Sequence, residues 1–169
     1  LDGQMEVSGF KGKRLVNSFY RGDGTTGTLT SPEFVIDRPY ITFLIGGGKN
    51  GVDTCMNLLV DGKTVRSATG PNDKPGGSEA LGLECWDVKE FNGKTAVIQI
   101  VDQATGSWGH INVDQIVMTD KKAPILLSDA KRELKVEGRY LNIPIAEGAP
   151  RRKVTTFVDG KVAVINDIQ

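Results

Sequence analysis

The sequence predicts an all-β protein: a two-sheet β-sandwich of jelly-roll type with a short strand-rich C-terminal extension. Apolar residues alternate with polar ones in short runs, which is the period of half-buried strands. Glycine is abundant, with 21 residues among 169, while hydrophobic residues make up only 38%. This composition suits many short strands joined by turns. Many short strands with regular turns indicate a sandwich.

Strands are expected wherever this alternation runs between turn residues. The clearest turn is Asp61-Gly62, because these residues suit the two positive-φ positions of a type I′ hairpin. Pro32 and Pro39 lie at expected strand starts, where a missing N–H costs least. Only Ser128–Val136 could form a helix of any length. The expected strands of the sandwich are Leu15–Tyr20, Thr28–Thr30, Glu33–Ile36, Tyr40–Ile45, Thr54–Val60, Lys63–Thr69, Leu83–Val88, Thr95–Val101 and His110–Thr119.

A domain boundary is expected near Asp120–Pro124, where the apolar pattern ends and a polar run precedes a proline. Residues 1–120 would form the sandwich module, and residues 121–169 a strand-rich connector or the start of a second β domain. The tail is too small for a stable core of its own, so it either packs on the sandwich or belongs to the next domain. Its motif Phe157–Lys161 echoes Leu59–Lys63, which we interpret as one hairpin solution used twice. The strands expected in the tail are Tyr140–Ile145, Lys153–Val158 and Val162–Ile168.

Charge and hydropathy argue against two kinds of partner. Lysine plus arginine and aspartate plus glutamate balance at 21 each, so the basic excess of a nucleic-acid groove is missing. Apolar stretches such as Ile41–Ile45 are too short to span a bilayer. Cys55 and Cys85 form either one bridge or two small buried thiols, and they do not fix the compartment.

Motifs for catalysis or cofactor binding are weak. His110 is the single histidine, and it lies in an alternating strand pattern without the spacing of a His/Cys metal site. The glycine run Gly46–Lys49 lacks the Ser/Thr and the helix of a phosphate loop. Asp102, Asp114 and Asp120 could hold a structural Ca²⁺, but the chain has no dense Asp-x-Asp-x-Asp loop. We therefore expect no cofactor.

The residue types of a sugar site do occur close together. Sugars present apolar C–H faces and many hydroxyls, so their sites combine an aromatic platform with carboxylates, amides and arginine. Period-two spacing would place three polar residues of one expected strand on the same sheet face. The alternative is a tryptophan that caps the core edge beside a solvated polar face. The candidate ligand-binding residues are Trp108, His110, Asn112 and Asp114, with Arg21 and Asp23 in the loop after the first strand.

The chain resembles a module attached to family 32 glycoside hydrolases, the levanases, inulinases and related fructan hydrolases of gut Bacteroidetes. The resemblance covers nearly the whole chain. Its tail resembles the segment that connects this module to the catalytic propeller. The segments that carry the resemblance are Ser18–Asp23, Thr26–Phe34, Ile45–Gly48, Trp86–Val88, Gly93-Lys94, Ile100–Asp102, Trp108–Ile116, Tyr140–Ile145 and Arg152–Val154.

The resemblance implies an extracytoplasmic setting and a fructan-related function, but not hydrolysis by this chain. The family's catalytic motifs are Trp-Met-Asn-Asp-Pro-Asn-Gly, Arg-Asp-Pro and Glu-Cys. The first is missing, Asp37-Arg38-Pro39 is scrambled relative to the second, and only Glu84-Cys85 matches the third. Retaining glycosidases need two carboxyl groups held about 5–5.5 Å apart, which one glutamate cannot supply. The chain is therefore expected not to be an enzyme.

The leading hypothesis is a non-catalytic module that binds levan- or inulin-type fructans and is joined to a catalytic domain of the same polypeptide. Its rival is a structural spacer that packs on the catalytic domain without binding sugar. If Trp108 is an exposed platform for a sugar ring, we expect Trp108→Ala to weaken fructan binding severalfold and hardly to change the melting temperature.

Overall fold

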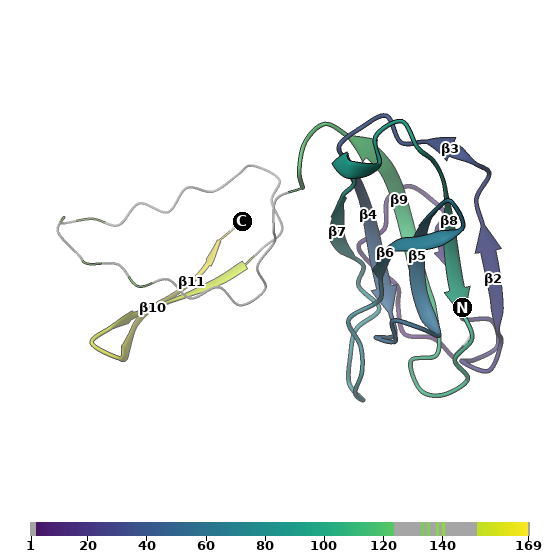
Figure 1. Cartoon of the computed structure of the whole chain (residues 1–169). Coiled ribbons are helices and arrows are strands. Elements are labelled where there is room, and N and C mark those ends of the chain that lie inside the picture. The colour runs from purple at the N-terminus through teal and green to yellow at the C-terminus, as the bar shows by residue number, and fades with distance from the viewer. Residues whose placement is uncertain are drawn as a thin grey trace. The chain divides into compact units, whose positions relative to one another are not determined.

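The computed structural model describes residues 3–123, 133, 135, 138, 140 and 152–168. Contacts divide the chain into two compact units, Leu1–Leu127 and Ser128–Gln169, each described by itself below (Figure 1). The helix considered for Ser128–Val136 falls mostly outside the described residues, as does the strand expected at Tyr140–Ile145. The division of the chain into a 1–120 module and a 121–169 extension therefore stays a prediction.

The first unit is a sandwich of two antiparallel sheets, as the sequence predicts (Figure 1). The chain passes from one sheet to the other at most of the connections between its strands, which gives the jelly-roll character. A single turn of 3-10 helix, Lys89–Phe91, precedes the eighth strand. The first sheet has the order β1 (Val16–Asn17), β9 (Ile111–Thr119), β4 (Tyr40–Gly47), β7 (Gly82–Asp87). The second has the order β2 (Gly27–Thr30), β8 (Thr95–Asp102), β5 (Thr54–Val60), β6 (Lys63–Ala68), with β3 (Phe34–Val35) also paired to β8.

The core lies between the two sheets and is built by period-two alternation. Ile41, Phe43 and Ile45 of β4 point into it, as do Met56 and Leu58 of β5. These side chains are at most 3% exposed, so each removes nearly all of its apolar surface from water. Strands of both sheets contribute to this one cluster, which makes the first unit a single packed sandwich.

The two cysteines are unpaired thiols, one in each sheet. Cys55 is buried on β5, and burial raises the pKa of its thiol. Cys85 is half-buried on β7. Of the two alternatives left open by the sequence, the structure has the free thiols.

Strand β9 ends at Thr119 as expected but differs from its expected form at its start and near its middle. It begins at Ile111, one residue later than expected, so His110 lies just before the strand. Its pairing with β4 shifts register between Thr42 and Leu44, and Gln115 adopts a φ of 50° opposite this shift. Such a bulge re-aims the side chains that follow it. The period-two pattern of β9 therefore holds only up to Asp114.

The described part of the second unit is one antiparallel hairpin, β10 (Arg152–Val158) and β11 (Lys161–Ile168). Both strands agree with the expected ones to within one residue. Its turn is Asp159-Gly160, and both residues have positive φ.

Candidate functional site

Four polar side chains meet at the start of β9, on the sheet face that points away from the core. Nδ1 of His110 lies 2.6 Å from Oδ1 of Asp23, and Nε2 lies 3.0 Å from each oxygen of the Glu79 carboxylate. The same carboxylate accepts a hydrogen bond of 2.9 Å from Nδ2 of Asn112. We call His110, Asp23, Glu79 and Asn112 the buried polar cluster. Because both ring nitrogens face carboxylates, its geometry suits a histidine that donates from both of them.

Three members of the cluster are buried, and Asp23 is partly exposed. His110 is 2% exposed, Glu79 3% and Asn112 not at all. Glu79 lies in the loop between β6 and β7, residues 69–81, which we call the covering loop. The N-terminal segment pairs with this loop through Ser8 and Ala80. The contacts of Glu79 with His110 and Asn112 join the covering loop to the start of β9.

Asn72 holds the other end of this loop. Its side-chain Nδ2 donates to the carbonyl oxygens of Gly47 and Ser78, at 2.8 Å and 2.9 Å. Its Oδ1 accepts from the Ser78 backbone amide at 3.0 Å. Asn72 thus ties the loop to the end of β4 with hydrogen bonds that are shielded from water.

Trp108 lies above the cluster in a restrained position. Its ring stacks on the His110 ring with 5.6 Å between centroids, and its Nε1–H donates to the Lys74 carbonyl oxygen at 2.9 Å. Its φ is 60°, a left-handed conformation that bulky residues rarely adopt. The backbone packs so tightly that a Cβ on Gly48 would come within 1.8 Å of the Trp108 carbonyl oxygen. Trp108 is therefore held by its surroundings and is half-buried.

A polar pocket of about 300 Å³ opens beside Trp108. Its rim includes an exposed ion pair, Lys49 and Asp73, with 3.5 Å between Nζ and Oδ2. Both side chains are at least half exposed, so their polar groups can exchange this contact for one with a ligand. The residues lining the pocket are Lys49, Asn50, Asn72, Asp73, Ala104, Gly106, Ser107 and Trp108.

The structure brings together four of the predicted site residues and separates two. Trp108, His110, Asn112 and Asp23 lie around the cluster. Asp114 instead accepts a hydrogen bond of 2.7 Å from the Lys11 backbone amide. Arg21 is exposed and lies over the ring of its neighbour Tyr20, 5.2 Å from the centroid. The ligand-binding role of all six stays a prediction, and the burial of His110 and Asn112 leaves Trp108 as the member that lines a pocket.

Sequence reasoning missed Glu79, Asn72 and the Lys49–Asp73 pair. The first two are polar residues in a Gly/Pro-rich loop, where polar residues are ordinary. Their roles depend on contacts with β4 and β9, which are distant in sequence. No local pattern signals such contacts.

Asp102, at the end of β8, is a buried carboxylate outside the cluster. It is 3% exposed, and neither of its oxygens has a hydrogen-bond partner among the described residues. Burial raises its pKa above the ordinary value of 3.8, while interactions with the Ser18 hydroxyl and the His110 ring lower it by less. Desolvation of the charged form is therefore the dominant influence on this carboxyl group.

We expect Asp102→Asn to stabilise the protein at pH 7 and to lose this advantage in acid. A carboxyl with a raised pKa binds its proton more tightly in the folded state, so stability falls as pH rises from 3.8 to the folded pKa and stays lower above it. The uncharged side chain of Asp102→Asn does not lose stability in this way. Urea unfolding from pH 3 to pH 7 measures the free energy of unfolding of wild type and variant, with Asp120→Asn on the exposed surface as control. If the stability advantage of Asp102→Asn over wild type grew on acidification, the pKa of Asp102 would not be raised in the folded state.

No metal centre is apparent in the described residues. Asp102, Asp114 and Asp120 have separate surroundings, and across residues 3–123 and 152–168 no three His, Cys, Asp or Glu side chains are arranged to hold a metal ion. The absence of a cofactor stays a prediction. Glu84 is exposed on β7 opposite Phe43 of β4. In the part of the chain described, no helix is long and apolar enough to cross a membrane.

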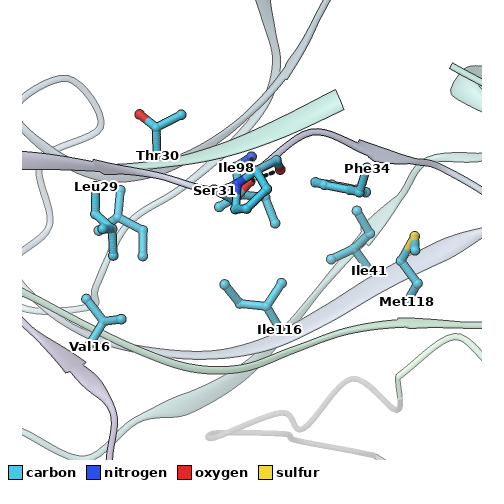
Figure 2. Close-up of a pocket in the computed structure, with 11 residues that line it drawn as sticks. Val16, Leu29, Thr30, Ser31, Phe34, Ile41, Ile98, Ile116 and Met118 are labelled. Atoms are coloured by element: carbon cyan, nitrogen blue, oxygen red, sulfur yellow. Dashed lines mark hydrogen bonds between the residues drawn. The ribbon is translucent and has the colours of Figure 1, made fainter. Parts of the chain in front are cut away.

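A second cavity, of about 470 Å³, is apolar and lies between the edges of the two sheets. Figure 2 shows Val16 and Ile116 from the first sheet facing Leu29 from the second. The Ser31 hydroxyl accepts a hydrogen bond of 2.9 Å from the Ile98 amide, so its oxygen is already occupied. Leu29 is 54% exposed and Ile116 39%. This cleft suits an apolar occupant rather than a sugar.

Comparison with known proteins connects the chain to glycosyl hydrolases. It is 48% identical over 123 residues to a protein of Aspergillus rugulosus named "Putative glycosyl hydrolase ecdE". The match covers 73% of this chain but 17% of that protein, so the chain corresponds to a small part of its relative's length. No protein-family model matches the chain, and no solved structure matches it significantly.

Proposed function

We propose that this chain is a non-catalytic carbohydrate-binding module of a glycoside hydrolase, and that it binds fructans at the Trp108 pocket. The observation that carries the proposal is a restrained, half-buried tryptophan at the edge of a polar hollow. The similarity to a small part of a protein named as a glycosyl hydrolase supports an accessory role. Fructan specificity, membership of family 32 and an extracytoplasmic setting are supported by the resemblance of the sequence motifs.

The pocket has the chemistry that a sugar ring requires. Its volume of about 300 Å³ is at the lower limit for ligand sites, which suits one or two sugar units. The indole offers apolar surface for C–H groups, and its position is set before a ligand arrives, which lowers the entropic cost of binding. Asp73 accepts hydrogen bonds from hydroxyls, Lys49 donates, and Asn50 can do both. Few groups take part, so we expect dissociation constants of roughly micromolar to millimolar size.

We expect Asp73→Ala to weaken binding of levan- and inulin-type oligosaccharides severalfold and to change stability by less than about 1 kcal/mol. Asp73 contributes a pocket carboxylate but only an exposed ion pair, and exposed pairs contribute little to stability. Isothermal titration calorimetry measures the affinity. The matched control is Asp120→Ala, which removes the carboxylate of another exposed pair, that with Arg38, outside the pocket. Equal affinities in both variants would place the sugar elsewhere.

We further expect the purified chain to release no fructose from levan, inulin or sucrose. Hydrolysis needs a nucleophile and an acid held as a pair, and the sequence matches only Glu84-Cys85 of the family's motifs. Reducing-sugar assays at high protein concentration test this. Turnover that is lost in Glu84→Gln would make the chain an enzyme.

The spacer function is favoured by one specific observation, the apolar cleft of Figure 2. Exposed apolar surface of this kind commonly packs against another protein surface. A wild-type chain that binds no fructan would leave the spacer as the better description.

A further inference from the structure

The two hairpins of the chain have the same turn. Val60-Asp61-Gly62-Lys63 joins β5 to β6, and the same four residue types join β10 to β11. Asp61 and Gly62 have φ angles of 51° and 73°, while Asp159 and Gly160 have 50° and 78°. These are the positive angles of a type I′ turn. Identical turns alone indicate only a common local solution.

The hairpins also share an irregularity that the turn does not require. Two residue pairs follow each turn, and then the register shifts, between Leu58 and Leu59 in one hairpin and between Thr156 and Phe157 in the other. The unpaired extra residues are Val65 and Ala163, at the same distance from their turns. A bulge is a specified feature of a sheet, so its recurrence at one position indicates equivalent hairpins.

The sequence before each hairpin repeats as well. Residues 40–48 read YITFLIGGG and residues 140–148 read YLNIPIAEG. The two strings share tyrosine at the first position, apolar residues at the second, fourth and sixth, and glycine at the ninth. The first string covers β4, which precedes β5 in the sandwich. The order of elements in the first unit is thus matched by the order of motifs in the second.

Equivalent positions differ greatly in exposure. Val60 is 5% exposed in the core, whereas its counterpart Val158 is 55% exposed. Val60 belongs to the core cluster between the two sheets, on strand β5, which pairs with both β6 and β8. Its cross-strand partner on β8 is Ala96. In the described residues β10 pairs only with β11. A two-stranded hairpin is at best marginally stable alone, so this one needs further partners.

We propose that the edge of β10 opposite β11, which no described residue pairs, binds an extended apolar protein strand in the antiparallel arrangement in which β5 binds β8, as part of a second sandwich of this fold. The partner has the chemistry of β8, with aliphatic side chains at alternate positions such as Ala96, Ile98 and Ile100. Such a strand forms ladder hydrogen bonds along the edge of β10 that no described residue pairs, and it places an apolar cross-strand neighbour beside Val158. The proposal does not depend on sugar binding.

The test supplies such a strand to the full chain. Residues 94–103, which contain β8, are appended through a flexible Gly/Ser linker of about 20 residues. That linker averages about 25 Å end to end, enough to pass a hairpin strand of seven residues. Backbone amide exchange is followed by NMR. We expect at least tenfold slower exchange at β10 amides not already bonded to β11.

Two controls keep the result specific. In the first, the residues of the appended segment that correspond to Ala96, Ile98 and Ile100 are replaced by serine, and we expect no protection. In the second, Val158→Asp in the chain should abolish the protection without altering unfolding of the first unit. Unchanged exchange at β10, or protection along β11 instead, overturns the proposal. A stable dimer of the unextended chain through β10, seen by sedimentation, overturns it too, because the occupant would then be a second copy.

Discussion

Replacing His110 by alanine should lower the free energy of unfolding by about 3 to 5 kcal/mol, the range for a buried pair that loses one partner. The histidine lies between Asp23 and Glu79, and Glu79 is 3% exposed. Without the ring, Glu79 keeps the hydrogen bond from Asn112 but loses its polar contact with Nε2 of His110. The ring contacts with Phe19 and Trp108 are lost as well. Urea or guanidinium unfolding measures the change.

The matched control is Arg38→Ala, which breaks the exposed pair with Asp120. Those side chains are 50% and 66% exposed, so the loss should be below about 1 kcal/mol. A loss of similar size in both variants would mean that the buried cluster contributes no more than a surface pair. The comparison separates the loss of buried polar contacts from the loss of an exposed salt bridge.

The fold was predictable because its signals are local. Alternation placed Thr54–Val60 as a strand with both of its ends correct, and Asp61-Gly62 placed the following turn. Which side chains of a strand face the core, and where a tight turn forms, depend mainly on residues that are adjacent in sequence. Strand β1 was expected over Leu15–Tyr20 but pairs only at Val16–Asn17. Its length depends on how much of the β9 edge it reaches, which is a tertiary property.

The candidate site was only partly predictable, for a related reason. Period two correctly placed His110 and Asn112 on one side of the sheet, away from Ile111 and Val113 in the core. It could not show that this side is covered by a loop carrying Glu79, which is 31 residues away from His110. A polar face expected to meet solvent or sugar is thus mostly internal. The candidate binding surface is therefore the pocket beside the cluster, which Trp108 lines.

Trp108→Ala should have the largest effect on function, because it removes the platform of the proposed site and should abolish detectable fructan binding. The structure also changes the stability expected of this variant. An exposed platform could be removed freely, whereas Trp108 stacks on His110 and donates to Lys74. We therefore expect a loss of about 3 kcal/mol, the lower end for a large core aromatic, because the side chain is only half-buried. Calorimetric titration and thermal unfolding measure the two effects.

Trp108→Phe separates the platform from the scaffold. It keeps an aromatic ring over His110 but loses the N–H donor to Lys74, so it should cost about 1 kcal/mol and retain measurable binding. Affinity should therefore follow the order wild type, Trp108→Phe, Trp108→Ala, measured below the melting temperature of the weakest variant. Asp73→Ala should lie between wild type and Trp108→Ala in affinity but remain close to wild type in stability, because its ion pair is exposed. If Trp108→Ala alone lost affinity while Asp73→Ala bound normally, the loss would reflect a loosened loop, and the pocket would not be the sugar site.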